Sequence, residues 1–169
     1  MRRLMLAAIL LAGCGSQQGV KPPPATSKQP DLLKNRIYPL AELPVADLRV
    51  NGKPVKAWVV DDELKRAEGM MWLRDENVRQ DQGMLFVFPK AQPMSFWMKN
   101  TLMPLDIAFI SPKGKILNIQ QGKPEDETPL PSKGSALYVL EMKAGSMQAL
   151  GAKPGSQIAI PDSVAQGER

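Results

Sequence analysis

The side chains that could do chemistry in this chain of 169 residues are polar groups placed among apolar neighbours. Lys99 and the two residues after it follow Trp97 closely and are flanked by methionine and leucine. Asp106 and Glu141 lie within apolar segments, where a buried carboxylate requires a partner or hydrogen bonds. Aromatic walls with a few fixed polar groups suit a small polar ligand such as a saccharide or a carboxylate. The candidate ligand-binding residues are Arg66, Arg74, Trp97, Lys99, Asn100, Thr101, Asp106 and Glu141.

The same residues allow two other interpretations. Asp106 and Glu141 are candidates for the catalytic acid and base of a hydrolase acting on a glycan, provided that their carboxyl groups face each other about 5–9 Å apart. Alternatively, Lys99 could pair with either carboxylate to satisfy buried charge. Arg66 could cover Glu141 in the same way, and the segment 100–101 could build a turn. A hydrolase and a structural or interaction module therefore stay open beside the favoured interpretation, which is binding of a small ligand or a partner protein.

The absence of histidine and the presence of one cysteine exclude several kinds of site. A chain without histidine has no Ser-His-Asp triad, no Cys-His nucleophile and no histidine metal ligand. A lone cysteine forms neither an internal disulfide nor a cysteine zinc site. Methionines are soft ligands that suit Cu(I), but Met94, Met98 and Met103 fall in apolar segments and are better explained as core residues. We expect no metal and no cofactor.

The charge of the chain argues against nucleic acid as a partner. Lys and Arg number 22 against 17 Asp and Glu, a formal net charge of +5, and the basic residues are spread along the sequence. Few aromatic residues alternate with them, as they would on a nucleic-acid-binding surface. No apolar segment reaches the ~18 residues that a membrane-spanning helix needs. The expected partners are a small polar ligand or an envelope protein.

The N-terminus has the layout of a secretory signal peptide over residues 1–13. Arg2 and Arg3 precede a short apolar segment, and small residues follow it. The sequence Leu-Ala-Gly before Cys14 resembles the lipobox of bacterial lipoproteins, in which the cysteine receives fatty acyl chains such as palmitate and begins the mature chain. A signal peptide that only happens to contain a cysteine is the alternative. The agreement of charge, apolar segment and lipobox favours lipidation of Cys14.

A lipidated Cys14 predicts a protein anchored to a membrane of the cell envelope and facing the periplasm, because two or more acyl chains hold a protein stably. The residue after it is Gly15 rather than aspartate, which points to the outer membrane. Residues 14–36 are rich in proline, glycine and polar residues, so we expect a disordered tether. A proline-rich recognition motif at 22–24 is the alternative.

The folded domain is expected over residues 37–161, with a polar tail at 162–169. Asn51 and Gly52 separate two segments of alternating polarity, a pattern typical of a hairpin with a type I′ turn. Further strands are expected at 84–88, 95–98, 105–110, 115–120, 136–141 and 157–160, with short helices at 62–68 and 144–150. This order predicts a β-rich α+β fold with two short helices and a mostly antiparallel sheet or partly closed barrel.

Several motifs resemble those of the family called domain of unknown function 192 (DUF192). They are Gly-Met-Leu-Phe-Val-Phe at 83–88, Phe-Trp-Met-Lys-Asn-Thr at 96–101 and Pro-Leu-Asp-Ile-Ala-Phe-Ile at 104–110. The resemblance extends upstream to Arg66, Gly69, Met70, Met71 and Arg74, and downstream to Val-Leu-Glu at 139–141 and Ala-Gly at 144–145. It covers residues 45–161, which is nearly the whole expected domain.

Membership of this family implies a compact β-rich fold and a setting in which secreted or lipid-anchored bacterial proteins are common. It brings no established activity with it. The chain has Gly155 and Ser156 where the family often has Gly-Asp before its last strand, so no role of that aspartate carries over. The function therefore has to be inferred from the residues themselves.

Overall fold

The computed structural model describes residues 31–165, and side chains as far as residue 164. The predicted signal peptide, the lipidation site at Cys14 and most of the predicted tether lie outside these residues, as does the end of the polar tail. Within the described range a 3₁₀ turn at Leu32–Asn35 comes first, and the next residue, Arg36, is buried. Regular structure thus begins a few residues before the expected start of the domain.

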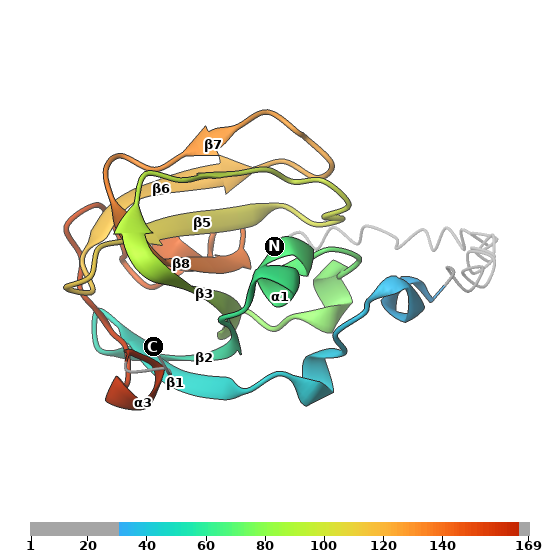
Figure 1. Ribbon diagram of the computed structural model, residues 1–169, viewed down its shortest axis with the longest axis horizontal. Coiled ribbons are helices and arrows are strands. Elements are labelled where there is room, and N and C mark those ends of the chain that lie inside the picture. Colours follow the sequence, from blue (N-terminus) through green and yellow to red (C-terminus); the bar gives the residue numbers. More distant parts are fainter. Residues whose placement is uncertain (1–30, 166–169) are drawn as a thin grey trace, which may run out of the picture. The chain divides into compact units, whose positions relative to one another are not determined.

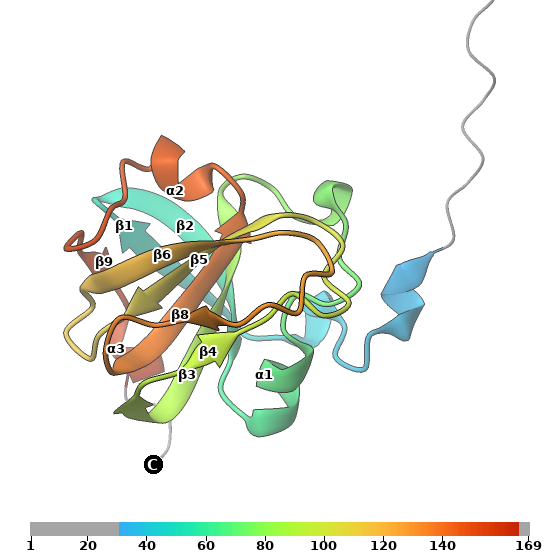
Figure 2. The same cartoon turned by 90° about the horizontal axis from the view of Figure 1, so that it is seen from above.

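A curled sheet of seven strands forms the body of the domain (Figures 1 and 2). Its strands are Val45–Val50 (β1), Lys53–Val60 (β2), Gln82–Gln92 (β3), Leu105–Ile110 (β5), Ile116–Gly122 (β6), Ala136–Lys143 (β8) and Ile158–Ala159 (β9). They lie in the order β6-β5-β8-β3-β2-β1-β9. The short strands Ser95–Phe96 (β4) and Leu130–Pro131 (β7) pair separately. The predicted β-rich fold is confirmed.

The sheet is mixed rather than antiparallel throughout, because β2 and β3 pair in parallel. The other strand pairs of the described part are antiparallel. Parallel neighbours need a crossover connection, and helix α1 (Glu63–Glu68) lies in the one between β2 and β3. Two more short helices, α2 (Ser146–Ala149) and α3 (Asp162–Ala165), make three in the described range instead of the expected two.

Local sequence signals explain the first hairpin and the limits of α1. Asn51 and Gly52 form the turn between β1 and β2 with φ of 49° and 79°, as a type I′ turn requires. Asp62 caps α1 by accepting a hydrogen bond of 2.8 Å from a backbone N–H three residues further on. Gly69 ends α1 with φ of 50°, and a β-carbon there would lie 3.0 Å from the Phe86 ring. The end of α1 therefore packs closely against β3.

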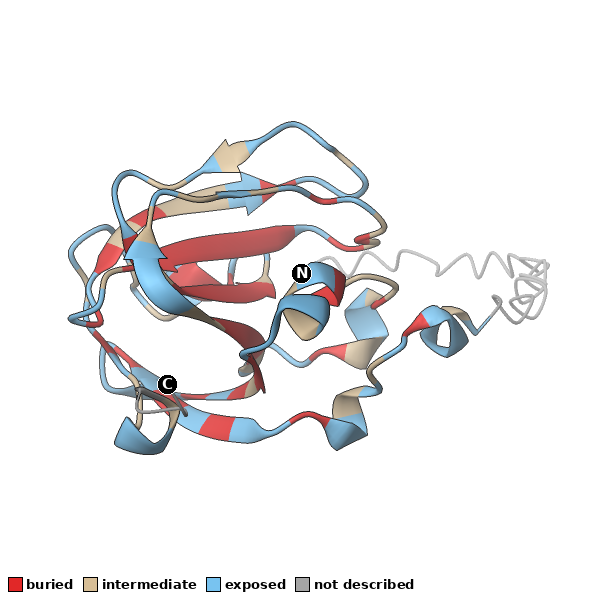
Figure 3. Cartoon of the chain, viewed as in Figure 1, coloured by how far each residue is buried: buried red, intermediate tan, exposed pale blue. Residues whose placement is uncertain are grey.

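Apolar side chains pack on both faces of the sheet, and β5 is buried along its whole length (Figure 3). What we call the first face carries a core that includes Leu85, Ala108, Leu140 and Met142. The second face carries a core that includes Met84, Phe86, Ile107 and Val139. A central strand that is covered on both faces has a nearly continuous apolar sequence, so polar and apolar residues do not alternate along β5.

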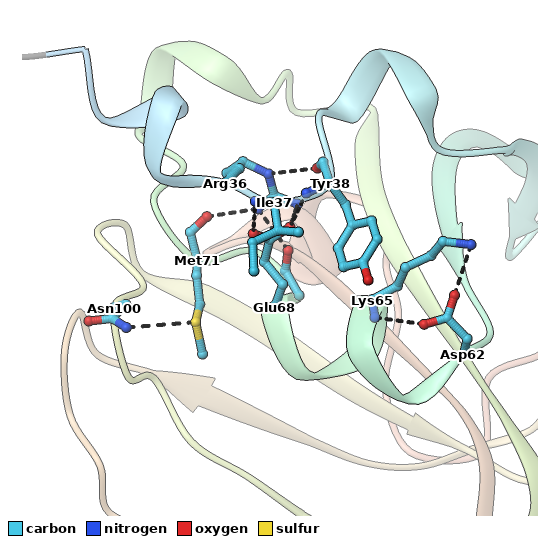
Figure 4. Close-up of polar contacts among 9 residues, drawn as sticks. Arg36, Ile37, Tyr38, Asp62, Lys65, Glu68, Met71 and Asn100 are labelled. Carbon is cyan, nitrogen blue, oxygen red and sulfur yellow. Dashed lines mark hydrogen bonds and ion pairs between the residues drawn. The ribbon is translucent and has the colours of Figure 1, made fainter.

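A buried ion pair fastens the first described segment to the end of α1 (Figure 4). Arg36 Nη2 lies 3.2 Å from Glu68 Oε2, and both side chains are less than a tenth exposed. Arg36 Nη1 donates to the backbone carbonyls of Gly69 at 2.9 Å and Met71 at 2.7 Å. The Glu68 carboxylate also accepts the backbone N–H groups of the two residues after Arg36. Burial lowers the pKa of Arg36, and the charge of Glu68 opposes this shift.

Candidate functional site

A pocket of about 400 Å³ lies where α1 and the turn after it meet the second face of the sheet. Its apolar walls are Met70, Met71, Phe86, Phe88, Phe96 and Trp97. Its polar lining is Glu63, Arg66, Glu68, Gln92, Ser95, Lys99, Thr101 and Glu141. Most of the candidates from the sequence thus meet in one pocket beside Trp97. Arg74, Asn100 and Asp106 are not part of its lining.

Glu141 is the buried acid of this pocket. It lies on β8, between its Cα partners Met84 on β3 and Ile107 on β5, so its side chain belongs to the second face. The residue is 4% exposed, and no hydrogen bond or ion pair reaches its carboxyl group from another residue within 31–165. Desolvation by burial raises the pKa of Glu141 to about 8. The group is therefore mostly protonated and uncharged at pH 7.

Two cations of the lining rest on aromatic rings. Lys99 Nζ lies 5.1 Å from the centre of the Trp97 ring, and Arg66 Cζ lies 5.0 Å from the centre of the Phe88 ring. Arg66 Nη1 donates to the backbone carbonyls of Val87, at 2.8 Å, and of Asp61. Neither cation forms an ion pair with a carboxylate of the described part. Cation–π contacts of this kind hold a charged group in place without neutralising it.

Asp106 belongs to a different part of the domain. Its Cα partner on β8 is Met142, so it points to the first face, opposite to Glu141. Its carboxylate accepts the backbone N–H of Met147 at 3.0 Å, at the start of α2. Burial raises the pKa of Asp106, and hydrogen bonds from α2 and from Gln121 oppose this shift. Asp106 therefore has a structural role, because its carboxylate caps the segment around α2.

The predicted acid–base pair does not form. Asp106 and Glu141 project from opposite faces of one sheet, since their strand partners differ by one position in register. Two carboxyl groups separated by a sheet cannot flank one scissile bond. The predicted pairing of Lys99 with either carboxylate is likewise wrong, because no such ion pair occurs among the described residues.

Asn100 and Arg74 lie outside the lining of the pocket. Asn100 adopts φ of 54°, and its carbonyl accepts the backbone N–H of Trp72 at 2.9 Å. Its amide nitrogen lies 3.8 Å from the sulfur of Met71. Figure 4 marks this contact with a dashed line. This confirms the turn that the Asn-Thr sequence suggested. Arg74 lies after the same loop, and its Nε is buried without a hydrogen-bond partner in the described part.

An aromatic cluster in the pocket wall was not predicted from the sequence. The Phe96 ring meets Phe86 at 5.0 Å, Phe109 at 5.7 Å and Phe88 at 6.4 Å between ring centres, each in an edge-to-face arrangement. Phe86 and Phe88 are two residues apart on β3, so they share a face of that strand. This spacing was the available signal, and the separate placement of Phe96 in the sequence concealed the cluster.

The described part offers no metal site of the usual kind. Within residues 31–165, His, Cys, Asp and Glu do not gather in any group of three that could hold an ion. Met98 and Met103 are 0% and 1% exposed and belong to the core of the second face.

Within residues 31–165, no helix is long and apolar enough to cross a bilayer.

Solved structures that resemble this chain include two that are 32% identical to it. One comes from Sinorhizobium meliloti 1021 and is described as a candidate transcription regulator; it is 32% identical, has a TM-score of 0.66, and the match covers 70% of this chain and 95% of that one. The other comes from Novosphingobium aromaticivorans DSM 12444 and is described as a protein of unknown function; it is 32% identical with a TM-score of 0.65. That match covers 73% of this chain and 91% of the other. Comparison with curated proteins finds no match.

The family comparison covers the pocket and the sheet together. The model of DUF192, described as an uncharacterised ACR, matches residues 46–160. This range contains α1, every strand from β2 to β9 and each residue of the pocket lining. The extent of the match agrees with the motifs at 83–88, 96–101 and 104–110. The chain belongs to the DUF192 family.

Proposed function

We propose that this protein binds a small polar ligand in the pocket beside Trp97, and that it does so at the cell envelope, anchored through a lipidated Cys14. The observation that carries the binding function is the carboxyl group of Glu141. It lines the pocket, it is buried, and no residue of the described part hydrogen-bonds to it. The 97–101 segment, which the sequence marked as the binding face, supplies one wall of the same pocket.

The energetics of burial support this proposal. A buried polar group without a hydrogen bond costs about 1–3 kcal/mol of stability. Folding alone would favour an apolar side chain at position 141, because its strand neighbours Met84 and Ile107 are fully buried. A ligand that hydrogen-bonds to the Glu141 carboxyl would recover this free energy on binding. Proteins commonly retain such local costs where the group serves a function.

The shape of the site favours a small molecule over a flat protein surface. A volume of about 400 Å³ lies within the range of ~300–1,000 Å³ that is typical of small-ligand pockets. Trp97 is 49% exposed beside this pocket, so its ring is accessible to a ligand. Aromatic rings next to a few polar groups provide both apolar contact and orientation.

Two other functions have less support. A hydrolase built on Asp106 and Glu141 lacks the facing carboxylates that it needs. The description of the Sinorhizobium relative suggests a role in transcription. Nucleic-acid binding requires a basic surface, whereas basic and acidic side chains are nearly balanced over residues 31–165. The pocket therefore favours a small ligand.

Binding is tested with the purified full chain and a panel of small saccharides and small carboxylates. We expect some members to raise the melting temperature and to give saturable heat in titration calorimetry. The Glu141→Leu variant should weaken their binding by tenfold or more, because leucine has no group that can form the carboxyl hydrogen bond. Glu141→Gln keeps a donor and an acceptor and should bind about as well as the wild type, whose Glu141 is mostly uncharged at pH 7.

The matched control is Asp106→Asn. It removes a carboxyl group from the opposite face of the sheet, and it should leave the affinity for pocket ligands unchanged. Equal binding by wild type and Glu141→Leu, or the absence of any binder in the panel, would contradict the proposed site.

The envelope anchor has its own test. In a bacterial host, metabolic labelling with palmitate should tag the wild-type chain, and Cys14→Ser should lose the label and move from the membrane to the soluble fraction. An equal label on Cys14→Ser would contradict lipidation at this residue. It would leave the ligand site untouched, because the two parts of the proposal rest on separate residues.

A further inference from the structure

We infer that the ligand is a small organic anion. Arg66 and Lys99 bind its negative group, its apolar body contacts the aromatic rings, and an uncharged polar group at its other end hydrogen-bonds to Glu141. This inference rests on the proposed binding function and names its ligand class. It combines three observations on the lining: two cations without ion pairs, several aromatic side chains, and a buried acid without a partner.

Both cations have hydrogen-bond donors that no residue of the described part uses, so these donors are available to an anion. Lys99 is exposed, and no residue within 31–165 accepts a hydrogen bond from its ammonium group. Arg66 uses Nη1 for two backbone carbonyls, and its Nη2 and Nε have no partner in the same range. The rings of Phe88 and Trp97 hold these groups in position. Pre-positioned guanidinium and ammonium groups bind carboxylates through charge-assisted hydrogen bonds.

The remaining charges of the lining cancel only part of the charge of these two cations. From α1 the acidic groups are Glu63, which is exposed, and Glu68, whose charge is paired with Arg36. The parts of β3 and β4 that line the pocket carry no charged side chain, and Glu141 is itself mostly neutral at pH 7. Two cations, Arg66 and Lys99, against the one unpaired carboxylate of Glu63 therefore leave an excess of one positive charge in the lining.

The exposure of the lining residues orders the site from its mouth to its base. Lys99 and Trp97 are exposed, whereas Glu141 is buried, so the cations lie nearer to solvent than the acid. Phe86 and Phe96 contribute apolar surface to the same pocket. An anionic group then stays near water, an apolar body contacts the rings, and a hydroxyl, carbonyl or amide group reaches the acid. The pocket volume suits one such molecule rather than a polymer.

A cationic ligand is the clear competitor, because a carboxyl group at the base of an aromatic pocket could instead ionise and hold an ammonium group. Such a ligand would have to pass Lys99 and Arg66, and it would release a proton from Glu141 on binding. The two ligand classes therefore differ in their pH dependence. Binding that uses the protonated acid weakens above the pKa of about 8, whereas ammonium binding strengthens there.

The test uses three probes that share a ring and an alcohol hydroxyl group and carry one anionic, neutral or cationic substituent: 4-(hydroxymethyl)benzoate, 4-(hydroxymethyl)benzamide and 4-(hydroxymethyl)benzylamine. With the full chain at pH 7 and low salt, ligand-observed NMR should rank their affinities as acid, then amide, then amine. We expect at least a tenfold preference for the acid over the amide, and about a tenfold weaker affinity of the acid at pH 9 than at pH 6.

Substitution of Lys99 separates the anion site from the rest of the pocket. Lys99→Gln should reduce the preference for the acid over the amide several-fold and leave the affinity for the amide unaffected, because Arg66 still holds part of the anion. The control Lys113→Gln removes the same charge from the exposed turn between β5 and β6 and should change neither affinity.

The outcomes distinguish this inference from the proposed function. Tightest binding of the amine, equal binding of all three probes, or a preference for the acid that is undiminished in Lys99→Gln would overturn the anion assignment and leave the ligand site standing. Should none of the three bind, the charge preference among the binders of the wider panel decides in the same way. A panel without any binder removes the proposed function, and the inference with it.

Discussion

The Glu141→Gln variant is expected to gain stability relative to wild type as the pH rises from 5 to 8, by a few kcal/mol in total. Burial raises the pKa of Glu141 to about 8 in the folded protein, whereas the ordinary value is 4.5. Between pH 4.5 and about 8, the Glu141 carboxyl has lost its proton in the unfolded chain and has kept it in the folded chain. Stability then falls with pH, at up to about 1.4 kcal/mol per pH unit. Glutamine has no proton to lose, so the variant lacks this slope.

The sign of this effect is opposite to that of an ion-paired carboxylate. The protonated form of Glu141 is favoured by the fold, so its contribution is fully present below the ordinary pKa and is lost as the pH rises towards about 8. Urea unfolding of wild type and variant at several pH values between 5 and 8 measures the difference. Other titrating groups, such as Asp106, are present in both proteins and cancel in the comparison.

The exposed Glu76 provides a matched control. Glu76→Gln removes a carboxyl group from the surface and should keep the pH slope of the wild type. Parallel stability curves for wild type and Glu141→Gln would show that the Glu141 carboxyl is hydrated or paired in the folded protein. That result would also remove the observation on which the binding function rests.

Removal of the Arg36 side chain is expected to cost about 3–5 kcal/mol of unfolding free energy, because one partner of a buried ion pair would remain without compensation. The Arg36→Met variant keeps the apolar stem but leaves the Glu68 carboxylate buried with only backbone N–H partners. It also frees the carbonyls of Gly69 and Met71, which Arg36 Nη1 holds at 2.9 and 2.7 Å. Guanidinium unfolding at pH 7 measures the loss.

Two further variants show whether burial is the cause. Replacing both Arg36 and Glu68 by methionine should recover much of the lost stability, because no unpaired charge then remains in the core. Lys56→Met breaks the ion pair with Asp47, whose side chains are 57% and 80% exposed, and should cost less than about 1 kcal/mol. A similar small cost for Arg36→Met would mean that water reaches Glu68.

This ion pair also connects the segment before the family match to the pocket. Arg36 lies before residue 46, where the match begins, yet it holds the backbone of Gly69 and Met71, which line the pocket. The motif residues around 69–71 are therefore fixed by a side chain outside the motif. The residues around Arg36 in the sequence do not predict this ion pair, because its partner Glu68 lies 32 positions further along.

Much of the fold could be predicted because the relevant signals are local. The positive φ values at Asn51 and Gly52, the cap at Asp62 and the break at Gly69 depend on a few neighbouring residues each. The parallel pairing of β2 with β3 depends on strands that meet through a crossover, and residue alternation contains no information about strand direction. The sheet was therefore expected to be antiparallel and is mixed.

In the candidate site, too, some features follow from the local sequence and others only from strand pairing. From sequence alone, Asp106 and Glu141 looked equivalent, since each is a carboxyl group in an apolar strand. The register of β5 against β8 sends one to the cap of α2 and the other into the pocket, because successive side chains of a strand point to opposite faces. The sequence by itself determined which groups are unusual enough to do chemistry. Only the tertiary structure decided which of them meet, because a shift of one position in strand pairing reverses the face on which a side chain lies.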